Sequence, residues 1–400
     1  MRIRPHSAWP LVVMTVLVAR GAPAEAKRVA SPPPGADFVE DALLMLRVVA
    51  CAGDHAVPEA WAKVVAAHCK DMDERLADFR ARYIDKAEPF LAPLRPAGLP
   101  TSVVYPFGGG DLVSALITYP DALEITTVSL EHAGDPTRLR GLSSKELKKH
   151  LGRFREAVRG LLANHDSASA NMQKLERGPI PGQLSFFLVA AAAMGYLPAS
   201  LRFFRVEADG ALHYFEQAEI DEQGGTRARK KKGSWVDTDY SVAYTNVELT
   251  LDNPTTGRAV VHRHMAANLE NAAFAGSGLE QHLQQKGTVV AMTKAASYLL
   301  WSDNFSGIRD YLVANATFMV SDSTGIPSAI ASKAGLEQTT YGRFSGPFLE
   351  ASERIAGAFR KLWKAQPYRK LPFRYGYPDA AGKVHLLITQ RAAATAGAKP

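Results

Sequence analysis

The sequence has little of what most functional signatures need. Only two cysteines occur in 400 residues, Cys51 and Cys69, and even with His55 nearby they fall short of the four ligands of a structural zinc site. No apolar run is long enough to cross a bilayer in the mature protein, and no basic stripe interleaved with aromatic residues indicates nucleic-acid binding. We therefore expect no metal site, no transmembrane segment in the mature chain and no nucleic-acid partner.

The charge excess is small and local. With 46% hydrophobic and 22% charged residues, the composition is that of an ordinary soluble globular protein, and the net charge is only +7. Part of this excess lies in one run, Arg227–Lys232, which we interpret as a solvated loop rather than a patch for nucleic acid.

The N-terminus has the pattern of an export signal. A basic start at Met1–Arg4 precedes a short apolar core at Pro10–Ala19, and small-x-small cleavage patterns follow within Ala22–Ala26. A buried N-terminal helix is the alternative, but a proline-rich stretch follows at once and favours a linker. We predict a signal peptide over residues 1–26, a linker over residues 27–36, and a location in the periplasm or outside the cell.

Residues 37–92 have helical periodicity and end at a cluster of prolines. Cys51 and Cys69 fall in two helical patterns that Gly53 and Pro58 separate. Because an even pair of cysteines can oxidise in an exported protein, a disulfide between them is one hypothesis. Two buried free thiols are the alternative.

Residues 93–391 alternate between strand-like and helical patterns. Apolar runs at residues 102–105, 288–292 and 317–320 predict buried strands, and four alternating runs between residues 201 and 264 predict an antiparallel section. A final strand pair is expected at residues 372–377 and 384–390. We predict an α/β fold, a Rossmann-like three-layer mixed sheet with an antiparallel insertion and a helical N-terminal segment, followed by a disordered tail at residues 392–400.

The strongest local signal is a glycine-rich turn after the first predicted strand. It consists of Phe107, Gly108, Gly109, Gly110 and Asp111. Glycines let the backbone approach a ligand, and N–H groups at a helix N-terminus favour anions. An acidic residue, Glu131, follows about twenty residues later, as in dinucleotide-binding folds. In general pattern the stretch is similar to motif one of the class I methyltransferases.

Three features argue against an anionic nucleotide as the ligand of this turn. Pro106 and Phe107 replace the usual Asp-x-Gly of the methyltransferase motif, and Asp111 stands where a small residue is normal and would repel a phosphate. Nucleotide cofactors are also scarce outside the cytoplasm. A structural tight turn is therefore the alternative, and we assign no cofactor.

A second polar turn follows the predicted strand at residues 317–320. It contains Asp322, Ser323 and Gly325. Both turns are expected at the carboxyl ends of strands, where open α/β sheets bind ligands, and they would face one crevice if the two strands were neighbours. A nucleophilic Ser323 would lack a G-x-S-x-G elbow and a histidine placed to serve it, so a capping or turn role is the alternative.

Two further patterns carry less information. His262 and His264 lie on one face of a predicted strand, where two imidazoles can ligate a metal, but no carboxylate has an obvious third-ligand spacing, so we expect exposed histidines. Lys294 and Tyr298 do not have the order or spacing of a Tyr-x-x-x-Lys pair, and we assign them no role.

Three motifs together resemble an uncharacterised family of bacterial proteins, many of which have export signals. These motifs are YPFGGGD at Tyr105–Asp111, KAASYL at Lys294–Leu299 and DSTGIP at Asp322–Pro327, and the closing LPFRYGY at residues 371–377 also fits. The resemblance implies one domain in which the motifs lie together. It implies no activity and no catalytic residue.

The leading hypothesis is an exported protein that binds a small ligand in a crevice at strand ends. The residues expected to line it are Phe107, Gly108, Gly109, Gly110, Asp111, Glu131, Asp322, Ser323 and Gly325. An enzyme, either methyltransferase-like or a hydrolase that uses Asp111 and Asp322, is the first alternative. A structural or assembly protein of the cell envelope with a degenerate nucleotide-type fold is the second, and it predicts a filled crevice.

Overall fold

A computed structural model describes most of the chain. It covers residues 35–164, 175, 178–224, 241–322, 325–344, 346, 353–376 and 384–391. The predicted signal peptide, the basic run Arg227–Lys232, Ser323 and the predicted tail at residues 392–400 lie outside these residues. Of the predicted linker, only Gly35 and Ala36 are described, and the Ala36 N–H donates to the Phe215 carbonyl at 2.8 Å.

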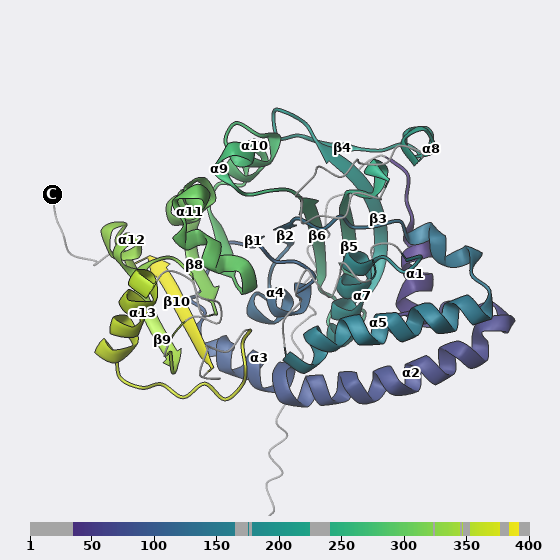
Figure 1. The fold of residues 1–400 in the computed structure, drawn as a ribbon, viewed down its shortest axis with the longest axis horizontal. Coiled ribbons are helices and arrows are strands. Elements are labelled where there is room, and N and C mark those ends of the chain that lie inside the picture. The colour runs from purple at the N-terminus through teal and green to yellow at the C-terminus, as the bar shows by residue number, and fades with distance from the viewer. Residues whose placement is uncertain are drawn as a thin grey trace, which may run out of the picture.

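One mixed sheet of ten strands forms the centre of the molecule (Figure 1), in the order β4-β3-β5-β6-β2-β1-β7-β8-β10-β9. The strands are β1 Ser102–Pro106, β2 Glu124–Ser129, β3 Leu197–Val206, β4 Leu212–Tyr214, β5 Asn246–Asp252, β6 Ala259–Ala266, β7 Val289–Thr293, β8 Ala316–Ser321, β9 Leu336–Gly342 and β10 His385–Arg391. This sheet bears out the predicted mixed α/β fold.

Five neighbouring strands, β6-β2-β1-β7-β8, are parallel. The chain builds β1, β2 and β6 outward on one side and then returns to place β7 and β8 on the other side of β1. The order therefore reverses between β1 and β7, which is the topological switch point at which open α/β sheets bind ligands. Next to β8, β10 is antiparallel to both of its neighbours, β8 and β9.

The four runs between residues 201 and 264 form strands, and the pairs β3–β4, β3–β5 and β5–β6 are antiparallel as predicted. In addition, β6 pairs in parallel with β2, so this section is continuous with the main sheet. The expected closing strand pair is wrong, because residues 371–376 form no strand and β10 pairs instead with β9. The run that forms β9, LEQTTYG, lacks the apolar alternation by which a strand is predicted.

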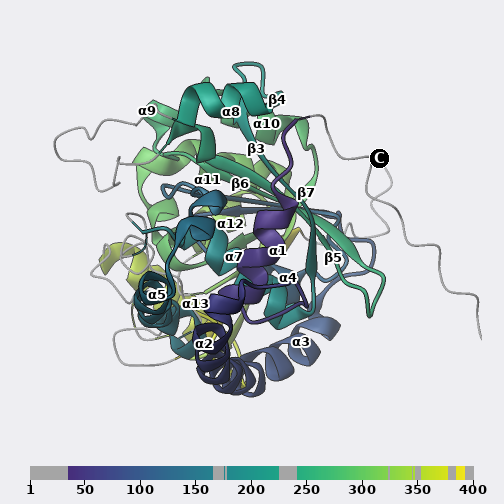
Figure 2. The ribbon, with the colours of Figure 1, turned by 90° about the vertical axis from the view of Figure 1, so that its right-hand side faces the viewer.

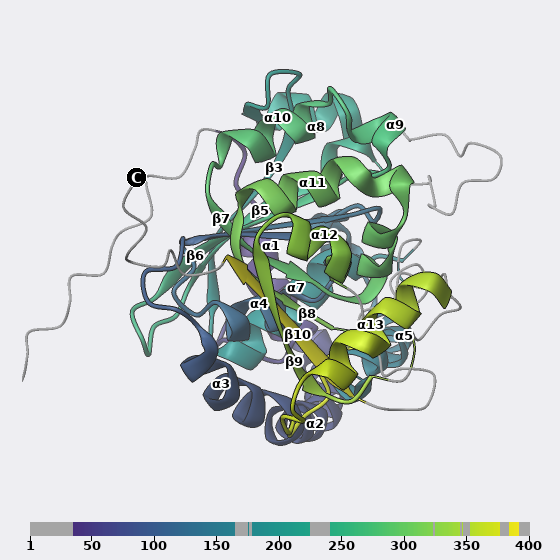
Figure 3. The same ribbon diagram turned by 90° about the vertical axis from the view of Figure 1, so that its left-hand side faces the viewer.

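Helices cover both faces of the sheet, with α2 and α5 on one side and α9 and α10 on the other (Figures 1 and 2). Figure 3 shows α11 and α12 in front of the sheet when it is seen from the other end. The helices are α1 Val39–Val48, α2 Glu59–Phe79, α3 Asp85–Leu91, α4 Leu112–Thr118, α5 Ser144–Asn164, α7 Gly182–Met194, α8 Gln217–Gly224, α9 Asn271–Phe274, α10 Gly278–Gln285, α11 Ser306–Asn315, α12 Ser328–Lys333 and α13 Glu353–Ala365.

Alternate residues of the central strands β1, β7 and β8 enter two different hydrophobic cores. Val103 and Tyr105 of β1 belong to the core formed with α1, α2, α4, α5 and α7, whereas Val104 belongs to the core formed with α9–α12. This alternation is the period of two that a strand imposes on its side chains. A three-layer arrangement follows, with the sheet between two helical layers.

The N-terminal helices belong to the first of these cores. Phe38, Trp61 and Tyr83 are buried in the same cluster as the strands of the sheet. Cys51 and Cys69 form a disulfide with their Cα atoms 5.3 Å apart, and it joins the loop after α1 to α2. In the described part of the chain, every helix is too short or too polar to cross a membrane.

Candidate functional site

The three sequence motifs meet at one edge of the sheet. Each follows a different strand: Phe107–Asp111 comes after β1, Lys294 directly after β7, and Asp322 directly after β8. Because these strands are parallel and adjacent in the order β1-β7-β8, their carboxyl ends lie side by side. The strands before the two polar turns, β1 and β8, are not neighbours but are separated by β7, and Lys294 lies at the end of the strand between them.

A buried ion pair joins the first two motifs. The Lys294 Nζ atom lies 2.6 Å from Asp111 Oδ2, and both side chains are almost completely shielded from solvent. The Tyr105 hydroxyl donates to the same Asp111 oxygen at 3.0 Å, and the Ser114 hydroxyl donates to Oδ1 at 2.8 Å. Asp111 also accepts from the Ser114 backbone N–H and so caps the N-terminus of α4. Its carboxylate therefore points into the protein.

Ser114 completes the polar network around Lys294. Its single hydroxyl hydrogen is used on Asp111, so its two lone pairs accept from Lys294 Nζ at 2.8 Å and from the Tyr83 hydroxyl at 2.8 Å. Burial raises the pKa of Tyr83 and of Tyr105 well above the usual range, and the Asp111 charge raises each further. Both phenols are therefore neutral donors at physiological pH.

Aromatic rings and the third motif surround the Lys294 ammonium. It lies 5.1 Å from the centre of the Tyr375 ring and 5.7 Å from that of Tyr83, in cation–π geometry. Gly376, with φ +126°, has no room for a side chain: a Cβ there would lie 2.8 Å from Asp322 Oδ2 and 3.0 Å from Lys294 Cε. Asp322, which is fully buried, therefore lies close to Lys294, so all three motifs and the closing LPFRYGY meet here.

Helix α7 packs directly against the glycine-rich turn. A Cβ on Gly110 would lie 2.7 Å from Phe186 Cβ in α7, and one on Gly108 would lie 3.0 Å from the Tyr105 ring. Gly109 and, unusually for a residue with a side chain, Phe107 have positive φ values of 49° and 61°. Local packing thus accounts for Gly108 and Gly110, whereas the backbone strain at Phe107 has no such explanation.

The buried position of Asp111 bears on the repulsion of a phosphate that we expected from its charge. Lys294 pairs with this charge at 2.6 Å, and burial shields it from solvent. The expected repulsion between Asp111 and an anionic ligand is therefore weakened. Neutralisation by a residue 183 positions away is a tertiary effect that no local pattern reveals.

Glu131 lies one strand further along, after β2. Its side chain is buried, and its carbonyl lies 2.7 Å from His264 Nε2. A carbonyl only accepts, so Nε2 carries the hydrogen and His264 Nδ1 accepts from the Thr127 hydroxyl at 3.1 Å. Thr127 in turn accepts from His262 Nε2 at 3.0 Å. The two histidines and Thr127 therefore form a directed chain that ends on the Glu131 backbone.

The expectation of exposed histidines is wrong. His262 and His264 do share one face of β6, as the alternation predicted, but α7 covers that face and the Phe187 ring lies 4.3 Å from the His262 ring. Burial lowers the pKa of His264 to about 4, partly offset by the Glu131 carbonyl, and burial also lowers the pKa of His262 well below its usual value. In the described part of the chain, no group of three metal-ligating side chains occurs.

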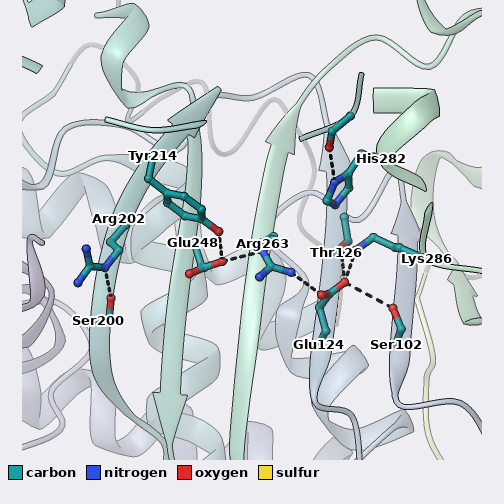
Figure 4. Close-up of polar contacts among 11 residues, drawn as sticks. Ser102, Glu124, Thr126, Ser200, Arg202, Tyr214, Glu248, Arg263, His282 and Lys286 are labelled. Carbon is teal, nitrogen blue, oxygen red and sulfur yellow. Dashed lines mark hydrogen bonds and ion pairs between the residues drawn. The ribbon is translucent and has the colours of Figure 1, made fainter. Parts of the chain in front are cut away.

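A second charged cluster, which the sequence did not indicate, lies on the other face of the sheet (Figure 4). Arg263 pairs with Glu124 and, through Nε at 2.6 Å, with Glu248; Lys286 also pairs with Glu124. The Tyr214 hydroxyl donates to Glu248 at 2.5 Å. Burial alone would raise the pKa of Glu124, but Lys286 and Arg263 outweigh it and hold that pKa at about 2.

The remaining predicted residues take structural positions. Gly325 has φ +72°, a Cβ there would lie 2.7 Å from Ser321 Oγ, and its carbonyl accepts from Trp301 Nε1 at 3.2 Å. Ser323 lies outside the described residues. The structure thus brings Asp111 and Asp322 close to Lys294, whereas Phe107 packs against Phe305 and Glu131 lies after the end of the adjacent strand β2.

Comparisons of the chain with protein-family models, curated proteins and solved structures find no match. The resemblance to exported bacterial proteins with the YPFGGGD, KAASYL and DSTGIP motifs therefore stays a prediction. Function has to be argued from the geometry of the site.

Proposed function

We propose that the protein binds a small ligand at the carboxyl ends of β1, β2, β7 and β8. The observation that carries this proposal is the meeting of three motifs, distant in sequence, at the topological switch point between β1 and β7. A buried ion pair seldom adds net stability compared with apolar packing, so its presence there needs another reason. Holding the turn after β1 in a fixed shape is such a reason.

Phe107 supplies the second argument. Its positive φ of 61° costs roughly 1–3 kcal/mol for a residue with a side chain, and such strain gathers at binding sites. The ring is partly exposed and packs edge-to-face against Phe305, with 5.8 Å between centroids. Beyond β2, Leu130 is 44% exposed. Apolar side chains at this edge favour a ligand with an apolar part.

A thermal-shift screen of the full chain against a broad metabolite panel, followed by titration calorimetry, tests this proposal. We expect at least one ligand whose affinity falls at least tenfold in Phe107→Leu and in Glu131→Gln. Glu270→Gln, an acidic side chain at the start of α9, should leave the affinity unchanged. If no compound binds, or if both site variants bind as tightly as the parent, these strand ends have a structural role and bind no ligand. The alternative of a structural protein with a filled crevice would then be favoured, in agreement with the packing of Phe186 on Gly110.

A methyltransferase-like activity is the second candidate, and the sheet order favours it. Omitting the inserted β3–β5, the strands run 3-2-1-4-5-7-6 in chain order with the seventh reversed, which is the order of class I methyltransferases. Likeness of fold alone does not establish an activity. Calorimetry with S-adenosylmethionine tests it: saturable binding that Glu131→Gln weakens at least tenfold would support it, and no heat at millimolar ligand would exclude it. The predicted export signal argues against it.

A further inference from the structure

A cavity of about 400 Å³ lies away from the switch point, between the end of β9 and the end of α13. Thr340, Arg343, Phe344, Trp363, Lys364, Gln366 and Tyr368 are among the residues that line it, and no carboxylate is among its lining residues in the part of the chain that the structure describes. Its volume is within the usual range for small-molecule sites.

The floor and one wall of this cavity are preformed. Phe344 packs against Trp363 with 5.2 Å between ring centroids, and Phe359 stacks on Trp301 beneath them at 5.0 Å. On the wall, Gln366 Oε1 accepts from the Thr340 N–H at 3.1 Å, while Nε2 donates to the Gln338 carbonyl at 2.7 Å. A ligand would therefore meet a fixed surface and would not have to order it.

The two cations that line the cavity, Arg343 and Lys364, have no carboxylate partner among the described residues. Arg343 is exposed and lies 5.2 Å from the centre of the Tyr368 ring, but neither Arg343 nor Lys364 forms an ion pair within the described part of the chain. Tyr368 itself is 62% exposed, which is unusual for so large a side chain. Lys364 lies in the last turn of α13, where it also offsets the partial charge of the helix end, so Arg343 carries the argument.

A similar pair elsewhere shows what is unusual here. Arg205 lies 5.7 Å from the centre of the Phe215 ring, but its guanidinium also meets Glu207 at 2.8 Å and Glu219 at 3.5 Å. Arg343 has the aromatic ring of Tyr368 beside it, but within residues 35–344, 353–376 and 384–391, as far as they are described, no carboxylate pairs with it. A bound anion would take the position that the carboxylates occupy beside Arg205.

From this geometry we infer that the cavity is a binding site for a small planar organic anion, that is, a carboxylate or phosphate attached to an aromatic ring. Arg343 would bind the anion, and the exposed Tyr368 ring would stack on the planar part, as aromatic pairs do in offset geometry. The inference is independent of the site at the switch point, because none of its residues is shared.

Calorimetry on the full chain with 2-naphthoate as the probe tests this inference. We expect saturable binding at low salt, at least tenfold tighter than binding of neutral 2-naphthalenemethanol and of non-planar cyclohexanecarboxylate. Arg343→Gln and Tyr368→Leu should each weaken 2-naphthoate at least tenfold, whereas Arg205→Gln should not change it. Both test positions are exposed, so folding should be preserved, and circular dichroism checks it.

Three results would overturn the site. They are no saturable binding of 2-naphthoate at millimolar concentration, equal affinity for the three probes, and affinity unchanged in Arg343→Gln.

Discussion

The two charged clusters of this protein differ in what surrounds them. Lys294 and Asp111 form a dry pair among phenols and ring faces, with the buried Asp322 close by, and these residues come from segments that are distant in sequence. Glu124, Arg263, Glu248 and Lys286 form a chain of pairs on adjacent strands and at the end of α10, and Glu124 and Arg263 remain 27% and 18% exposed. Removing one partner of the buried pair leaves the other charge without its counter-ion, whereas removing one member of the network leaves other members that still pair with its former partners.

The largest effect is expected from removing the Lys294 charge. Lys294→Met keeps most of the side-chain volume but leaves Asp111 buried without its cation, which typically costs about 3–5 kcal/mol of unfolding free energy. Urea denaturation followed by circular dichroism measures it. A loss of less than about 1 kcal/mol, the range of exposed pairs, would show that solvent reaches the pair.

A smaller effect is expected in the network. Arg263→Gln removes one cation, but Lys286 still pairs with Glu124 and Tyr214 still donates to Glu248, so we expect a loss of about 2–3 kcal/mol, near the penalty for one unsatisfied charged group. The same urea titration compares the two variants. If Arg263→Gln costs more than Lys294→Met, the distinction between a dry pair and a shared network is wrong.

The buried histidine His264 and the network around Glu124 are expected to change the unfolding free energy in different pH ranges. His264 has its pKa lowered from 6.5 to about 4 by burial, so the unfolded chain binds the proton more readily. Its contribution is complete above pH 6.5 and is lost as pH falls toward 4, on the order of 2 kcal/mol by pH 5. Replacing it in His264→Gln should flatten this part of the curve of unfolding free energy against pH.

Glu124 titrates in a different window. Its folded pKa of about 2 lies below the ordinary 4.5, so its contribution is complete above pH 4.5 and is lost as pH falls through 2. Glu124→Gln should therefore change the pH dependence only below pH 4.5. A change between pH 6.5 and 4.5 in this variant would mean that the two windows are coupled.

The smallest effect concerns the glycine turn. Gly110→Ala places a Cβ 2.7 Å from Phe186 Cβ and should cost about 1–2 kcal/mol through overpacking. Gly152 lies inside α5 with nothing within 4 Å of an added Cβ, so Gly152→Ala should instead stabilise by up to about 1 kcal/mol. Thermal unfolding of both variants gives the comparison. Equal effects would mean that the turn does not require glycine for packing.

The sequence predicted the elements whose patterns are local. The apolar runs at β1, β7 and β8 identified three strands of the parallel sheet, and the period of two placed His262 and His264 on one face. The mixed α/β class followed from their alternation with helical patterns. β9 was missed because an edge strand with a polar run has no such pattern.

The candidate site could be predicted only in part. The turns at Asp111 and Asp322 were identified from glycine and acidic residues. Lys294 was assigned no role because it lacks the spacing of a Tyr-x-x-x-Lys pair, and its actual partner, Asp111, is 183 residues away. A lysine directly after a buried strand was the one available signal. The burial of His264 depends on α7, and the closure of the cluster by Tyr375 depends on the C-terminal segment. Neither contact can be predicted from the residues next to it in the sequence.

A double-mutant cycle on Lys294 and Asp111 tests most directly whether the motifs are built around this pair. The unfolding free energies of Lys294→Met, Asp111→Asn and the double variant give the coupling between the two side chains. We predict that the double variant is more stable than the sum of the two single losses implies, by about 2–3 kcal/mol. A coupling within about 0.5 kcal/mol of zero would contradict the account, because independent sites behave in that way.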